Sequence, residues 1–219
     1  MSLPRLAAAS LATLLLGVVL MLALHVVPPT SEISAVRRTL SEYALGPSKW
    51  VFDASVLLVA LGSGLAFYAL ARHGMVRPLS AGMFFGALWI VSLLVIVYFT
   101  KTDWSIGPSL SGTIHRYASV VAFVSLPLAV LSVARAVFPG APGWRFAARG
   151  LGVASLGFFG LILVGVVRMS MGGGPWWRFV PLGLVERAIA FTAVASVVVV
   201  VLGVLVRPVK SEELAGVAA

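Results

Sequence analysis

The segment ERAIAFTAVASVVVVVLGVLV, residues 186–206, begins with an acid and a base and then runs to its end without another charge. An α-helix needs roughly 20 predominantly apolar residues to cross the hydrocarbon core of a bilayer, and this segment is long enough. Five further runs have the same character, at residues 6–27, 51–71, 79–99, 114–134 and 146–167. The sequence therefore predicts an all-α polytopic membrane protein, a bundle of six transmembrane helices.

The composition supports this class and excludes others. Apolar residues make up 60% of the chain and charged residues 11%, against roughly 25% charged residues in soluble domains. Because the connections are short, residues 1–210 are predicted to form one transmembrane domain, followed by a flexible C-terminal tail at 211–219. The absence of cysteine excludes disulfides and thiolate sites. The net charge of +9 comes from scattered Arg and Lys residues near span ends, which argues against a nucleic-acid partner.

The connections alternate in length, and this bears on orientation. The long connections lie on one side of the membrane, at about 28–49, 100–112 and 168–184. Both termini lie on the other side, together with the short connections. The 16 Lys and Arg residues divide evenly between the two sides, but acids accompany mainly those on the side of the long connections. We therefore predict a multi-pass protein of the plasma membrane with both termini in the cytoplasm.

The first long connection has a helical pattern of its own. Apolar residues recur at helical spacing: Ile33, Val36, Leu40 and Tyr43. Thr30 or Ser31 can cap the start of such a helix, and Gly46 with Pro47 can end it. The pattern predicts a short amphipathic, interfacial helix between spans 1 and 2, lying over the outer end of the bundle.

Nearly all the ionisable residues that lie deepest in the spans are at the same end of them. Asp53 lies at the start of the second span, His115 and Arg116 at the start of the fourth, Glu186 and Arg187 at the start of the sixth, and His25 at the end of the first. Helices that begin on the same side bring these positions close together if spans 2, 4 and 6 are neighbours. The sequence thus predicts a shared polar pocket that faces away from the cytoplasm.

The residue types suggest chemistry for such a pocket. Partial desolvation can raise the pKa of a carboxyl group into the range useful for acid/base catalysis. Asp53 and Glu186 are therefore candidate acids or bases. His25 and His115 are candidate proton carriers. The candidate substrate-binding residues are Arg116, Arg187, Asp103, Glu42 and Ser119. The planar guanidinium group of arginine can donate two parallel hydrogen bonds to a phosphate or carboxylate group.

A structural interpretation of the same residues stays open. An acid in the first turn of a helix is stabilised by the helix dipole, which by itself explains Asp53 and Glu186. Arg116 and Arg187 can be the ion-pair partners of Asp103 and Glu186. A metal site would need three or four ligands, and His25, His115, Asp53 and Asp103 show no pair at the tight helical spacing of metal-binding motifs. The sequence identifies no metal site and no cofactor.

Three ordered pieces of the chain resemble a known family. They are SEYALGP at 41–47 continuing to Trp50 and Asp53, FTKTD at 99–103 followed by GTIH at 112–115, and GLVER at 183–187. The set is similar to the signatures of a bacterial six-span membrane family catalogued as domain of unknown function nine-nine-eight. That family more distantly resembles the Frag/DRAM/Sfk group, which takes part in lipid biology. The resemblance implies six spans and a site at these motifs, without implying a reaction.

These observations lead to two main hypotheses of function. In the first, the outward-facing pocket binds an amphiphile such as a lipid or isoprenoid and modifies it by acid/base chemistry, with membrane lipids as partners. In the second, the protein is a non-catalytic membrane subunit or lipid-sensing scaffold, and its polar rim is structural. A transporter ranks last, because transport predicts polar residues at mid-span, where this chain has little beyond serine and threonine.

Overall fold

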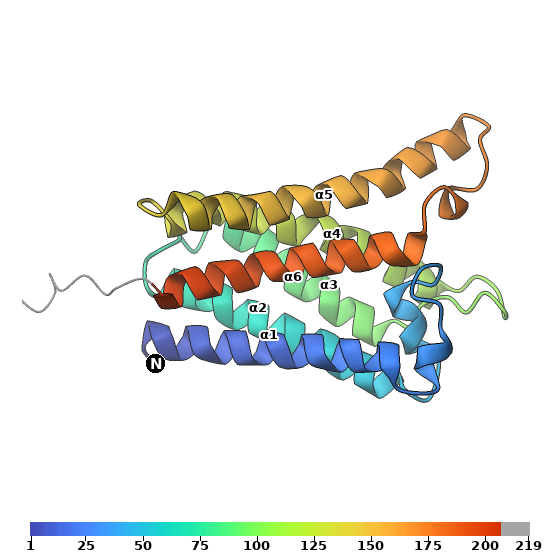
Figure 1. Cartoon of the computed structure of the whole chain (residues 1–219), viewed down its shortest axis with the longest axis horizontal. Helices are drawn as coiled ribbons and strands as arrows, with labels where there is room; N and C mark the ends of the chain where they lie inside the picture. The colour runs from blue at the N-terminus through green and yellow to red at the C-terminus, as the bar shows by residue number, and fades with distance from the viewer. Residues whose placement is uncertain (207–219) are drawn as a thin grey trace, which may run out of the picture.

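The computed structural model describes residues 1–206, and within them the chain forms six long α-helices and no strand (Figure 1). The helices are α1 Leu3–Val26, α2 Lys49–Arg72, α3 Ala81–Tyr98, α4 Leu110–Val137, α5 Pro142–Ser170 and α6 Leu182–Val206. All six are long and apolar enough to cross a membrane. The prediction of an all-α, six-span membrane protein is therefore confirmed, while the predicted tail at 211–219 lies outside the described residues.

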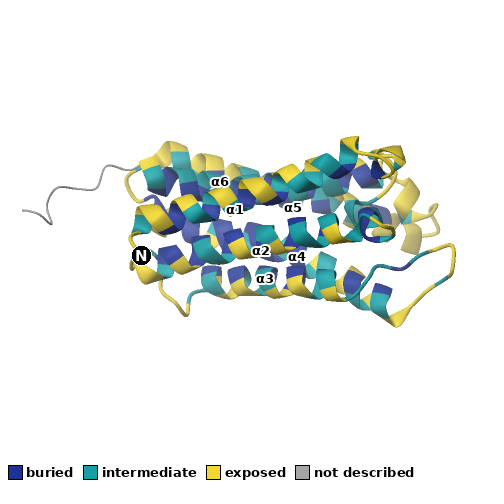
Figure 2. Cartoon of the chain, turned by 90° about the horizontal axis from the view of Figure 1, so that it is seen from below, coloured by how far each residue is buried: buried dark blue, intermediate teal, exposed yellow. Residues whose placement is uncertain are grey.

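The even-numbered helices form the centre of the bundle. Consecutive helices lie side by side, α6 returns to α1, and α6 also contacts α4 and α2. Over the most apolar stretch of each helix, 50% of α2, 50% of α4 and 44% of α6 is buried, against 28% of α1, 33% of α3 and 22% of α5. Figure 2 shows the resulting mixture of buried and exposed stripes along each helix. The odd-numbered helices therefore cover a core made mainly by α2, α4 and α6.

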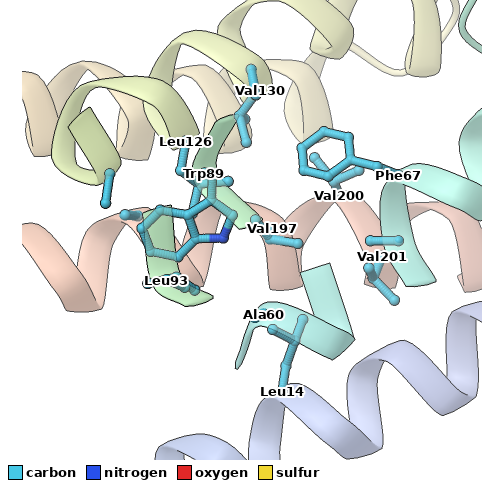
Figure 3. Packing of buried hydrophobic residues seen from close by; sticks show 14 of the residues in the cluster. Leu14, Ala60, Phe67, Trp89, Leu93, Leu126, Val130, Val197, Val200 and Val201 are labelled. Atoms are coloured by element: carbon cyan, nitrogen blue, oxygen red, sulfur yellow. The ribbon is translucent and has the colours of Figure 1, made fainter. Parts of the chain in front are cut away.

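Close contacts between large and small side chains fill this core. Phe67, Trp89 and Leu126 lie in one apolar cluster with valines of α6 (Figure 3). A Cβ atom added at Gly86 would lie 3.0 Å from the Phe67 ring, and one at Gly82 would lie 2.3 Å from a methyl group of Val133. Since lipid tails are as apolar as the helices, such close packing is a main source of helix association in a bilayer.

Serine hydroxyls join α1 to α2 at two places. Ser10 Oγ donates to the carbonyl of Gly62, and Ser55 Oγ donates to the carbonyl of Gly17, each over 2.7 Å. Each acceptor is a glycine at which the opposite helix comes within van der Waals contact. Hydrogen bonds of this kind between membrane helices contribute about 0.6 kcal/mol each. The mid-span serines thus have a structural role in this pair.

The two ends of the bundle differ, as the lengths of the connections predict. The N-terminus and the end of α6 lie at the same end as the short connections (Figure 1). The connections 27–48, 99–109 and 171–181 lie at the opposite end, which we call the polar end. All three central helices begin at the polar end, so their first two turns can contribute side chains to one region.

The predicted amphipathic helix between spans 1 and 2 does not form as one helix. The connection instead contains two short 3₁₀ helices, η1 Thr30–Glu32 and η2 Leu40–Ala44. Between these two helices, the Val36 carbonyl accepts a hydrogen bond from the Leu184 N–H over 3.2 Å. The Ala35 and Arg38 carbonyls accept hydrogen bonds from Arg187. An α-helix would bond these carbonyls to its own N–H groups four residues later. Contact with α6 therefore replaces the local helix.

Candidate functional site

Arg187 ties the first connection to α1 and α6. Its guanidinium donates to His25 Nε2 at 2.7 Å, to Tyr43 Oη at 3.1 Å, and to the carbonyls of Arg38 at 2.7 Å, Ala35 at 2.8 Å and Gly183 at 3.0 Å. We call these contacts the Arg187 network. A planar guanidinium with five N–H donors suits such a convergence of acceptors. In this structure Arg187 therefore holds protein groups, and its predicted role in binding an anion stays a prediction.

His25 acts as an acceptor inside this network. Its Nδ1 lies 2.8 Å from the Met21 carbonyl, which can only accept, so Nδ1 carries a proton. Nε2 then accepts from Arg187. The imidazole ring also meets the buried Tyr43 ring edge-on, with 5.2 Å between their centres. Both nitrogens are thus engaged with the protein, and the predicted proton-carrier role of His25 stays a prediction.

A second group of contacts links the connections over the start of α6. Glu186 Oε2 accepts from the backbone N–H of Leu40 over 3.0 Å. Lys101 donates to Thr39 Oγ1 over 3.1 Å and forms an ion pair with Glu42. Arg38 lies 3.6 Å from the other oxygen of Glu42. The structure therefore brings two predicted residues, Glu42 and Glu186, to the same short segment, η2.

Two glycines let the connections lie directly on the first turns of α4 and α6. A Cβ atom at Gly183 would lie 2.3 Å from the carbonyl oxygen of Arg38. One at Gly112 would lie 1.8 Å from Thr102 Oγ1 and 2.4 Å from the backbone nitrogen of Thr102. No other residue type fits these two positions unless the connection moves away. Both glycines belong to the motifs that carry the family resemblance.

Three side chains meet at the end of α3, and we call them the α3-end cluster: Lys49, Asp53 and His115. Lys49 Nζ lies 2.5 Å from Asp53 Oδ2 and 3.5 Å from the carbonyl of Val97. His115 Nδ1 lies 2.8 Å from the carbonyl of Phe99 and 3.2 Å from that of Ile96. The last carbonyls of a helix have no partner within it. The cluster therefore supplies donors to the end of α3 from both α2 and α4.

Two atoms of this cluster are buried and have no hydrogen-bond partner among the described residues: Asp53 Oδ1 and His115 Nε2. His115 as a whole is only 4% exposed. Because carbonyls face its Nδ1, that nitrogen carries the proton, and in the neutral ring Nε2 is an acceptor. A buried acceptor without a partner costs about 1–3 kcal/mol. Both unpaired atoms are thus acceptors that a donor would stabilise.

The other predicted site residues make no side-chain contact with the functional side chains of these groups. Arg116 is exposed, and its guanidinium lies 5.4 Å from the centre of the Trp104 ring. Asp103 Oδ1 accepts from the Ser105 hydroxyl at 2.6 Å and from the Ser105 N–H at 2.9 Å, and these bonds lower the pKa of the Asp103 carboxyl. Ser119 donates to the backbone carbonyl of His115. Asp103 and Ser119 thus have partners on their own segments, and Arg116 of α4 contacts the preceding connection.

The ion pairs in the structure differ from those that the sequence suggested. Among residues 1–206 they are Lys49 with Asp53, Lys101 with Glu42, and Arg38 with Glu42. Arg116 does not pair with Asp103, nor Arg187 with Glu186, because both arginines turn to aromatic or carbonyl groups instead. The residues that the sequence analysis missed are Lys49, Lys101 and Tyr43. Lys49 carried a signal in its position four residues before Asp53, and Tyr43 and Lys101 lie in motifs of the family resemblance.

Two cavities of about 10 Å³ each lie among apolar side chains of the core, such as Ala66, Leu70 and Val200. Neither is lined by a residue of the Arg187 network or the α3-end cluster. In the described part of the chain, no three His, Asp or Glu residues come together as metal ligands. The candidate site is therefore defined by its unpaired acceptors.

Comparison with known proteins yields one match. No curated protein matches the chain, and no solved structure does. A family model described as Protein of unknown function (DUF998) matches residues 5–203. This range includes all six helices almost completely, together with the three motifs at the polar end. The chain therefore belongs to the membrane-protein family described as Protein of unknown function (DUF998).

Proposed function

We propose that this membrane protein binds the headgroup of an amphiphilic lipid at its polar end, at the α3-end cluster. The main support is the pair of buried acceptors without partners, Asp53 Oδ1 and His115 Nε2. Both belong to membrane-spanning helices, where polar side chains are costly and therefore point to a functional site. A headgroup bound there would place its acyl chains along helices that are exposed to lipid.

Acid/base modification of the bound amphiphile is a second step that the same site would support. In the neutral ring of His115 the proton is on Nδ1, so Nε2 is the atom suited to take a proton from a bound hydroxyl group. Asp53 lies beside it in the α3-end cluster, with its Oδ2 2.5 Å from Lys49 Nζ. Product analysis with a purified lipid tests this step separately from binding.

The test of binding uses His115→Asn. The asparagine amide nitrogen takes the place of Nδ1, so it can still donate to the α3 carbonyls, but the variant has no atom at the Nε2 position. We expect wild-type protein to keep a bound lipid through gel filtration in detergent, and His115→Asn to keep less than about one tenth of it, with its melting temperature nearly unchanged. Mass spectrometry of the purified protein measures the retained lipid.

The control is Glu32→Gln, which removes an exposed charge at the same end of the bundle. It should keep as much lipid as wild type. Equal retention by His115→Asn and wild type would refute the proposed binding site.

The Arg187 network supports the rival function, a non-catalytic membrane subunit or scaffold. In that case the polar end only locks the helix ends together, as Arg187 does by holding carbonyls of the first connection. The two functions differ in one measurement. If His115→Asn loses lipid and thermal stability in parallel, the α3-end cluster is structural too, and the scaffold is the better description.

We also propose that the polar end faces outward across the plasma membrane. At the other end, the cations that form no ion pair with any residue of 1–206 are Arg5, Arg72, Arg77, Arg135, Arg145 and Arg149. At the polar end, Arg38, Lys49 and Lys101 pair with acids, whereas five arginines form no ion pair with a described residue: Arg37, Arg116, Arg168, Arg178 and Arg187. Unpaired positive charge in short connections is typical of the cytoplasmic side.

The lack of native cysteine makes orientation directly testable. Leu79→Cys and Ile106→Cys each place one thiol at a fully or highly exposed position, in a short and a long connection respectively. A membrane-impermeant maleimide added to intact cells should label Ile106→Cys and leave Leu79→Cys unlabelled until the cells are lysed. The opposite pattern would reverse the orientation, and no labelling of either in intact cells would place the protein in an internal membrane.

A further inference from the structure

We infer that the α3-end cluster selects a headgroup that donates hydrogen bonds, a primary ammonium or a hydroxyl group, over an anionic one. This inference rests on the proposed function and names the chemical class of its ligand. The buried groups without a partner are hydrogen-bond acceptors, and the partly buried donors already have partners.

Every group that the cluster leaves unsatisfied is an acceptor. Asp53 Oδ1 belongs to a carboxylate, and His115 Nε2 carries a lone pair because the ring proton is on Nδ1. The cluster lies at the C-terminal end of α3, where the helix dipole contributes negative potential. A ligand with N–H or O–H groups would complete these bonds, whereas a phosphate oxygen would meet like charge.

The cations that are partly buried at the polar end are already occupied. Lys49 is held by Asp53 and the Val97 carbonyl, Lys101 by Glu42 and Thr39, and Arg187 by its five acceptors. The remaining arginines of this end are exposed in the described chain: Arg37, Arg38, Arg116, Arg168 and Arg178. An anionic headgroup would therefore have to break existing contacts to find a buried donor, and a donor headgroup would not.

Phosphatidylethanolamine and phosphatidylcholine separate these possibilities, because they share a phosphate and differ in that choline has no N–H group. The full-length protein would be stripped of lipid in detergent and then incubated separately with four lipids: phosphatidylethanolamine, phosphatidylcholine, diacylglycerol and phosphatidic acid. Native mass spectrometry would measure the bound lipid. We expect at least about tenfold more retention of phosphatidylethanolamine, diacylglycerol or both than of phosphatidylcholine and phosphatidic acid. Retention of diacylglycerol would identify a hydroxyl ligand, and of phosphatidylethanolamine alone an ammonium.

His115→Asn should abolish this preference, and Glu32→Gln should preserve it. Equal retention of phosphatidylethanolamine and phosphatidylcholine that still depends on His115 would overturn the donor inference and leave the proposed binding site standing. Strongest retention of phosphatidic acid would overturn it as well. If no lipid is retained above the level of His115→Asn, the proposed function itself fails.

Discussion

Arg187→Met is expected to lower the free energy of unfolding by about 3–5 kcal/mol, because it leaves several partly buried acceptors without a donor, at about 1–3 kcal/mol each. Methionine fills similar volume but donates no hydrogen bond. It would leave His25 Nε2 and the carbonyls of Ala35 and Arg38 without their donor. The first connection would then lose its main attachment to α6. Titration of the detergent-solubilised protein with sodium dodecyl sulfate measures the loss.

Arg116→Met is the matched control, since it removes an exposed arginine whose guanidinium lies over Trp104 at the same end of the bundle. Its expected loss is about 0.5–1 kcal/mol. Arg187→Lys should recover only part of the stability, because an ammonium group cannot reach acceptors on several sides as a planar fork does. Losses of the same size at Arg187 and Arg116 would show that the Arg187 network does not hold the fold together.

Gly112→Ala is expected to cost about 3 kcal/mol, at the upper end of the range for overpacking. The new methyl group would lie 1.8 Å from Thr102 Oγ1 and 2.4 Å from the Thr102 backbone nitrogen. Rotation of the threonine side chain relieves only the first of these overlaps, so the backbone of the connection must move. Thr102 is 4% exposed, and we expect it to become accessible. The same titration measures the stability.

Gly157→Ala in the middle of α5 is the control for this change. A Cβ atom there meets nothing within 4 Å. Alanine favours a helix by about 1 kcal/mol relative to glycine, so this variant should be as stable as wild type or slightly more so. If Gly112→Ala behaved like Gly157→Ala, the connection would be free to shift, and contact with α4 would not fix its position.

The two sets of contacts at the polar end thus have different expected consequences. The Arg187 network has its donors and acceptors matched within the protein, so its loss should appear as instability. The α3-end cluster keeps two acceptors unmatched, so removal of Nε2 should appear as loss of a ligand. Measurement of stability and lipid retention on the same variants separates the two roles.

The number and order of the helices followed from the sequence, but their ends did not. The predicted span 79–99 agrees closely with α3, whereas α4 begins at Leu110 and not at 114. Ser109 explains the earlier start, because its Oγ accepts from the Gly112 N–H over 3.0 Å and caps the helix. Likewise α5 extends past the predicted 146–167 at both ends. An apolar run marks the part of a helix in the bilayer, and backbone hydrogen bonding continues beyond it.

The contacts of the candidate site could also be predicted only in part from the sequence. Sequence spacing could suggest contacts between residues four apart on one helix, such as Lys49 and Asp53. It gave no sign that Lys101 would cross to Glu42, or that the predicted amphipathic helix would lose its carbonyls to α6. Those contacts depend on how each connection folds over the helix ends.

The sequence by itself determined that the chain spans a membrane six times and that most of its acids and two of its three histidines lie at one end, because apolar length and the alternation of spans depend only on residue order. Only the tertiary structure decided which of these residues are satisfied and which are not. Hydrogen bonds act over about 3 Å and in fixed directions, and here they join residues as far apart as His25 and Arg187. Partners of that kind are selected by the folded path of the connections.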